Sequence, residues 1–184
     1  MKRSLFVAAL SAVLLTGGAA AAADDWYVQG NVGGGFASHF GDAAQDGDAG
    51  WAASGAVGRE FGNGWRADVE ALYLGAQNRS SGRGHTDVAG GFVNGYYDFN
   101  RGQPLEPFIG AGVGFANVRG AAAEDTGFAY QLKAGLAHPF SDNLTGEIAY
   151  RFVDVTGLRG GERASAFHGD YSSSAVTVGL RYHF

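Results

Sequence analysis

The chain has 184 residues, of which 17% are charged, 13% are aromatic and 32 are glycine, and its formal net charge is −5 at pH 7. An ordinary soluble domain has about 25% charged residues, and this much glycine disfavours a helical fold. Acidic residues outnumber basic ones, so the composition gives no sign of the positive charge that binding to nucleic acid requires. The absence of cysteine excludes disulfides and thiolate metal sites.

The N-terminus has the three parts of a secretory signal peptide. Two cations precede an apolar run over residues 5–15, and an alanine tract ends at Ala23. The apolar run is shorter than the ~20 residues that a spanning helix needs. We therefore predict a signal peptide, residues 1–23, that is cleaved between Ala23 and Asp24. The mature chain, residues 24–184, is predicted to form one barrel domain.

In the mature chain, apolar and polar residues alternate with a period of two, which is typical of strands with one apolar face. Glycine-rich or polar segments divide this alternation into eight stretches. The predicted strands are, in chain order, residues 26–40, 51–61, 65–77, 85–99, 107–118, 126–140, 144–158 and 175–184. The fifth stretch is rich in glycine, so its pattern does not indicate which face is apolar.

The segment Gly62–Gly64 joins the second and third stretches. A two-residue Asn-Gly hairpin would set Arg66 opposite Phe61 and place a charge among aromatic rings. A three-residue loop pairs Phe61 with Trp65 instead. The same register sets Glu60 opposite Arg66, so aromatic residues share one face and an ion pair lies on the other. We predict the three-residue loop.

The connections alternate between short turns and longer polar loops. This alternation is typical of an up-and-down barrel with short periplasmic turns, long outer loops and both termini in the periplasm. At ~3.3 Å per residue and a tilt of ~40°, the apolar end of the chain from Val176 to Phe184 covers roughly 23 Å, close to the ~25 Å apolar band of membrane barrels. We therefore predict an all-β fold, an eight-stranded antiparallel up-and-down transmembrane β-barrel, whose lumen is packed with side chains.

The polar faces of these strands would line the lumen. They carry four cations and five anions, and charges in a poorly hydrated lumen should balance in this way. The predicted charge network consists of Glu60, Arg66, Asp68, Glu70, Asp98, Lys133, Glu147, Arg151 and Arg181. Such a set could serve as a path for protons or ions, but the packed interior of eight strands favours a structural network of ion pairs.

Candidate catalytic and metal-binding groups are few. His168, Asp170 and Ser172 lie together in the last outer loop, where an enzyme that modifies membrane lipid could use them, but no glycine-rich elbow or oxyanion motif accompanies them. The acidic segment 42–48 has Ala44 where a calcium loop needs a ligand. The histidines show no metal spacing. We predict no enzymatic activity, no cofactor and no metal.

Four arginines lie in two of the predicted outer loops: Arg79, Arg83, Arg159 and Arg163. Guanidinium groups match the geometry of phosphate oxygens. These arginines are therefore candidate contacts for lipopolysaccharide phosphates or for an acidic polymer of a host. Ordinary loop charge without a ligand is the alternative.

Several short motifs follow one another along the mature chain. They are Trp26-Tyr27-Val28, Arg66-x-Asp68-x-Glu70, Asn94-x-Tyr96-Tyr97-Asp98-Phe99, Pro107-Phe108-Ile109-Gly110-x-Gly112-x-Gly114, Tyr150-Arg151-Phe152 and Arg181-Tyr182-His183-Phe184. In this order they resemble the small outer-membrane barrel family that is related to opacity proteins and to the transmembrane domain of outer membrane protein A.

The resemblance implies a place in the outer membrane of a Gram-negative type of cell, among its lipid and lipopolysaccharide. It also implies insertion by the barrel-assembly machinery, which would read Leu180, Tyr182 and Phe184 as a terminal signal. Members of the family are adhesins, envelope-stabilising proteins or porin-like proteins. The expected role is therefore envelope structure or surface interaction.

A secreted lipocalin-like barrel is the alternative fold, because it too has eight alternating strands. In that fold the apolar face would surround a small ligand and the charges would face water. The low total charge and the apolar C-terminal strand favour the membrane barrel.

Overall fold

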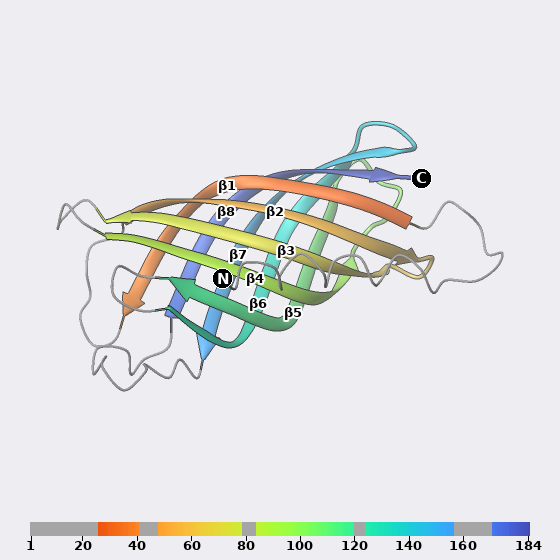
Figure 1. Cartoon of the computed structure of the whole chain (residues 1–184). Coiled ribbons are helices and arrows are strands. Elements are labelled where there is room, and N and C mark those ends of the chain that lie inside the picture. The colour runs from red at the N-terminus through yellow and green to blue at the C-terminus, as the bar shows by residue number, and fades with distance from the viewer. Residues whose placement is uncertain (1–25, 41–47, 79–83, 120–123, 157–170) are drawn as a thin grey trace.

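A computed structural model describes residues 26–40, 48–78, 84–119, 124–156 and 171–184. Its strands are β1 (Trp26–Phe40), β2 (Asp48–Phe61), β3 (Trp65–Asn78), β4 (Gly84–Asp98), β5 (Glu106–Arg119), β6 (Glu124–Pro139), β7 (Leu144–Thr156) and β8 (Tyr171–His183). Each strand pairs antiparallel with the next, and β1 pairs with β8 to close the barrel (Figure 1). Among the described residues, no helix is long and apolar enough to cross a membrane.

The predicted eight-stranded antiparallel barrel is confirmed, but the strand ends differ from the prediction. β2 begins at Asp48 rather than at residue 51, and β8 begins at Tyr171 rather than at residue 175. The backbone ladder continues past the apolar alternation, since Ala37 still pairs with Asp48 and Phe40 with Tyr171. Hydrogen bonds between strands need only backbone groups, so a polar side chain does not end a strand.

The turn between β2 and β3 has the predicted register. Phe61 pairs with Trp65 and Glu60 pairs with Arg66 across Gly62–Gly64. Gly64 has a φ of +91°, a backbone conformation that glycine adopts without the strain that a Cβ would cause. The turn therefore fixes which residues of β3 face the lumen.

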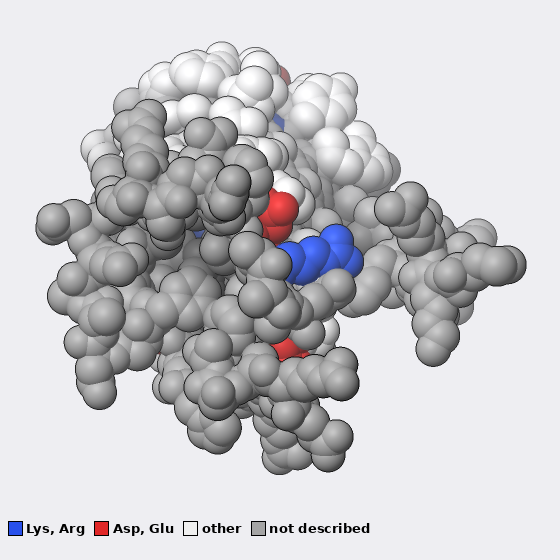
Figure 2. All heavy atoms as spheres, turned by 60° about the vertical axis from the view of Figure 1, so that its left-hand side comes forward, with Lys and Arg blue, Asp and Glu red and all other residues white. Residues whose placement is uncertain are grey.

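The outer wall of the barrel is apolar. One row of valines crosses five neighbouring strands at the same level, because each member pairs with the next: Val28, Val57, Val69, Val93 and Val113. Exposed aromatic rings lie near the turn end, among them Trp26, Trp65 and Tyr182. In Figure 2 the described side chains at the top of the view are almost all uncharged, and the largest charged groups in view lie below them, near the middle of the picture.

The three connections that the structure describes are short turns at one end of the barrel, which we call the turn end; the C-terminus also lies there (Figure 1). The other four connections all join strands at the opposite end, which we call the loop end. An apolar band outside and short turns at one end are the features of barrels that span a membrane.

Candidate functional site

The lumen has two layers along the barrel axis. A polar layer lies toward the turn end and contains the buried side chains Gln29, Asn31, Arg66, Asp68, Glu70, Asn94, Asp98, Gln131, Lys133, Arg151 and Arg181. An apolar layer lies toward the loop end and contains Ala52, Leu72, Leu74, Val88, Phe92, Ala116, Val118, Ala129, Val153, Val155 and Ala175. We call these the polar layer and the apolar plug.

Glu70 is the centre of the polar layer and is only 1% exposed. Its carboxylate accepts hydrogen bonds from Lys133 Nζ at 2.8 Å and Arg151 Nη2 at 2.5 Å. Two amides, Gln131 Nε2 at 2.7 Å and Asn94 Nδ2 at 3.1 Å, also donate to it. One carboxylate of β3 therefore joins side chains of β4, β6 and β7 across the lumen.

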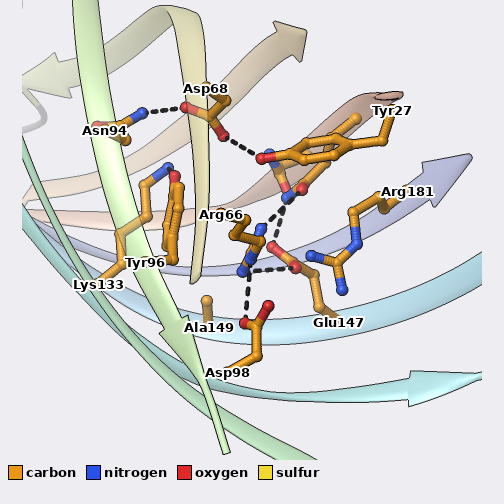
Figure 3. Close-up of polar contacts among 12 residues, drawn as sticks. Tyr27, Arg66, Asp68, Asn94, Tyr96, Asp98, Lys133, Glu147, Ala149 and Arg181 are labelled. Atoms are coloured by element: carbon orange, nitrogen blue, oxygen red, sulfur yellow. Dashed lines mark hydrogen bonds and ion pairs between the residues drawn. The ribbon is translucent and has the colours of Figure 1, made fainter. Parts of the chain in front are cut away.

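Arg66, four residues before Glu70 on β3 and closer to the turn end, forms the second centre (Figure 3). Its Nε donates to Asp98 Oδ1 at 3.0 Å, and its Nη2 lies 3.7 Å from Glu147 Oε2. The guanidinium carbon lies 4.0 Å from the ring centre of Tyr96 and 4.9 Å from that of Phe108. A buried cation is thus held by two carboxylates and two aromatic faces, which together offset its desolvation.

Asp68 joins β3 to side chains of β1 and β4 (Figure 3). It accepts a hydrogen bond from Tyr27 Oη at 3.1 Å and one from Asn94 Nδ2 at 2.6 Å. Gln29 Nε2 donates to Glu147 at 2.5 Å and so extends the network to β1. The alternating pattern already places Gln29 and Asn94 on polar faces, but neither Tyr27 nor Tyr96 is predicted as a network member, because the predicted network consists of charged residues alone.

A third cluster lies at the mouth of the turn end. Glu60 pairs with Arg101, with Arg181 Nη1 at 3.5 Å and with His183 Nε2 at 3.0 Å. Arg101 belongs to the turn between β4 and β5, which sequence reasoning treated only as a connection. These four groups line a polar hollow of about 350 Å³ together with Thr145.

The structure thus places all nine residues of the predicted charge network inside the barrel or at its turn-end mouth, where they pair across strands. Their role remains a prediction. The apolar plug was not predicted, because Leu72 and Leu74 continue the face of Asp68 and Glu70 with no change of period. The only available signal was the change from charged to apolar residues along that face.

The structure of β5 explains why its glycine-rich sequence does not indicate which face of the strand is apolar. Phe108 and Val118 are buried in the lumen, whereas Ile109 and Val113 are exposed on the wall. A Cβ on Gly112 would collide with Oδ1 of Asn94. Glycines on the inner face of β5 therefore make room for the large polar and aromatic side chains of β4.

Several predicted residues lie outside the described ranges. They are the signal peptide with Ala23 and Asp24, the loop arginines Arg79, Arg83, Arg159 and Arg163, and the residues His168 and Asp170. Ser172 is described and lies in β8, paired with Asp154 of β7. Within the described ranges, no group of three or more His, Asp or Glu side chains is arranged to hold a metal ion.

The C-terminal strand has the predicted faces. Leu180, Tyr182 and Phe184 are each more than half exposed on the outer wall, and Arg181 between them is buried in the lumen. The Phe184 amide donates to the Trp26 carbonyl at 3.1 Å, so the last residue still belongs to the closing seam of the barrel. A role of these residues in assembly remains a prediction.

A closed eight-stranded barrel with an apolar wall and a charged interior agrees with a comparison to known families. The family model described as the outer membrane protein beta-barrel domain matches residues 7–184. The chain belongs to this family. The protein is therefore an integral outer-membrane β-barrel, and the lipocalin-like alternative is wrong, because the apolar face points outward and the charges point inward.

Curated relatives agree with this assignment. An outer membrane protein of Gluconacetobacter diazotrophicus is 30% identical over 178 residues, which cover 74% of this chain and 47% of the relative. A putative adhesin of Rickettsia bellii is 25% identical over 99% of both chains. The chain spans about half the length of the first relative and of an outer membrane protein of Salmonella typhimurium. The curated relatives are named as outer membrane proteins or putative adhesins.

Solved structures show the same fold. Neisserial surface protein A superposes with a TM-score of 0.68 at 18% identity, covering 86% of this chain and 97% of that chain. The attachment invasion locus protein of Yersinia pestis has a TM-score of 0.51 at 16% identity, covering 88% of this chain and 99% of its own. At these identities the likeness concerns the fold alone.

Proposed function

We propose that the barrel is a closed anchor that holds its loop end at the cell surface for binding, in the manner of an adhesin. One observation carries the proposal: the polar layer and the apolar plug fill the lumen in series, from Arg66 to Val155. Packed side chains leave no aqueous path for a solute. The loop end is then the part of the barrel that can contact molecules outside the cell. A putative adhesin that matches over its full length supports a binding role.

The proposed ligand is a polyanion, either the phosphates of lipopolysaccharide or an acidic polymer of a host surface. The loop arginines, Arg79, Arg83, Arg159 and Arg163, belong to the connections at the loop end. Arginine binds phosphate and sulfate groups through two parallel hydrogen bonds, which a lysine does not reproduce. The proposal therefore depends on guanidinium groups and not on positive charge alone.

The test replaces the four loop arginines by serine and measures binding to immobilised heparin and to lipopolysaccharide. We expect binding to fall at least tenfold, on the order of 1.4 kcal/mol or more, with an unchanged amount of folded barrel in the membrane. The matched control replaces the same four residues by lysine, which keeps the charge and is expected to recover binding in part. Unchanged binding by the serine variant would rule out the loop arginines as the contact.

The proposal assigns no reaction to the barrel. If His168 and Asp170, together with Ser172 of β8, formed a site that modifies membrane lipid, His168→Ala would change the lipid A mass spectrum of cells that express the protein. We expect identical spectra for both proteins.

We further propose that the apolar end of β8, with Leu180, Tyr182 and Phe184, is the segment that the barrel-assembly machinery recognises during insertion.

A further inference from the structure

The outer wall has a groove that crosses five strands. Its floor is a row of residues that pair in sequence across β7, β8, β1, β2 and β3: Gly146, Leu180, Gly30, Gly55 and Ala71. Four of the five are small, but Leu180 is 55% exposed and rises from the floor on β8, and the Phe140 ring lies over Gly146. Nothing lies within 4 Å of a Cβ built on Gly30 or on Gly55, so the floor opens directly outward at both positions.

Larger side chains form both banks of this groove. On the loop-end side, the bank is the row Ile148, Val178, Val32, Ala53 and Tyr73, which is lowest at Ala53 on β2. On the turn-end side, the bank is the parallel row Leu144, Tyr182, Val28, Val57 and Val69. The groove is therefore built by the register of the barrel and does not depend on a single side chain.

Two hollows mark its course. One, of about 690 Å³, lies over β6, β7, β8 and β1 and is lined by Leu136, Phe140 and Ile148. The other, of about 430 Å³, lies over β1, β2 and β3, and both are lined by Gly30 and Val32. Both hollows are shallow and open outward along the wall.

The position of the groove decides what occupies it. It is continuous with the apolar wall that meets lipid, and Leu105 and Phe140 at its edge belong to the short turns, which face the periplasm in this class of barrel. If the groove stayed empty within the hydrocarbon core of the membrane, the side chains of both banks would lose van der Waals contacts. Five strands at ~4.8 Å give the row a length of about 19 Å, and with strands tilted by ~40° it spans roughly 12 Å of depth, within the ~15 Å of one hydrocarbon leaflet. The convex wall of a second barrel would touch the banks and leave the floor empty.

We propose that the groove is a binding site for one hydrocarbon tail of a phospholipid from the periplasmic leaflet. Gly30 and Gly55 form the floor against which the tail lies, and the valine and isoleucine banks hold it on both sides. A lipid bound in this way moves with the barrel and is not part of the freely exchanging shell around it.

Native mass spectrometry of the full protein in mild detergent, after addition of palmitoyl-oleoyl-phosphatidylethanolamine, tests the proposal. Gly30→Leu and Gly55→Leu fill the floor without striking neighbouring atoms, because both positions open outward. Gly95→Leu is the matched control, since it also points into open space but lines neither hollow. We expect one tightly retained phospholipid in the wild type and the control, and at least fivefold lower retention in the two floor variants.

Folding of each variant is checked by its circular dichroism, and Gly30→Ala, which fills less of the floor, should give an intermediate loss. Equal retention by all variants would overturn the proposal. So would preferential retention of added lipopolysaccharide, which belongs to the other leaflet. A dimer that disappears in Gly30→Leu with no change in bound phospholipid would overturn it in favour of contact between two copies.

Discussion

Replacing Glu70 by glutamine is expected to lower the free energy of unfolding of the barrel by about 3–5 kcal/mol, the usual cost of removing one partner from a buried ion pair. Glu70 is buried and accepts hydrogen bonds from both Lys133 and Arg151. The amide keeps the shape of the side chain but leaves two cations of the lumen without their shared anion. Urea unfolding in phospholipid vesicles, followed by tryptophan fluorescence, measures the change.

Two controls make the result specific. Asp142→Asn removes a carboxylate from an exposed turn and should change the unfolding free energy by well under 1 kcal/mol. The double variant Glu70→Gln, Lys133→Met should recover part of the loss, because it removes one of the two stranded cations. A Glu70→Gln barrel as stable as the wild type would show that this cluster does not stabilise the lumen.

Val178→Arg is expected to cost about 2–4 kcal/mol, the range for arginine on the lipid face near the midplane of the bilayer. Val178 is exposed on the outer wall between Val32 and Ile148. The cost should shrink to about 0–1 kcal/mol when the arginine is placed instead at Tyr182, nearer the turn end of the same face. Unfolding in vesicles measures both variants.

The inner face of the same strand supplies the contrast. Thr177 is buried in the lumen, so an arginine there would meet crowding and the carboxylates of the polar layer, with no depth dependence on lipid. Equal costs at Val178 and Tyr182 would contradict the position of the bilayer on this wall.

The sequence predicts the strands well because their period of two directly reports which side chains share a face. At the β2–β3 turn, that same period and the need to separate Arg66 from Phe61 are sufficient to fix the register. Strand ends are predicted less well, because the ladder of β2 extends to Asp48 through backbone groups that the side-chain pattern does not report.

The contacts inside the lumen could not be predicted from the alternation of residues along single strands. Alternation identifies Glu70, Lys133 and Arg151 as inward-facing, but their meeting depends on how eight strands are staggered around a closed barrel. Tyr96 shares the face of Asn94 and Asp98 but is not predicted as a network member, although its hydroxyl accepts a hydrogen bond from Lys133 Nζ at 2.8 Å in the lumen. The apolar plug is not predicted either, because Leu72 and Leu74 continue the inner face of Asp68 and Glu70 while Tyr73 between them is also apolar, so the contrast between the two faces of β3 ends there.

In the proposed function, the lumen is closed and the barrel acts through its loop end. Single-channel recording of the refolded protein in planar bilayers tests this claim most directly. The packed polar layer and the apolar plug, with Phe92 and Val153 almost fully buried, predict no stable conductance steps. Long-lived steps of the size that a porin gives would contradict the account.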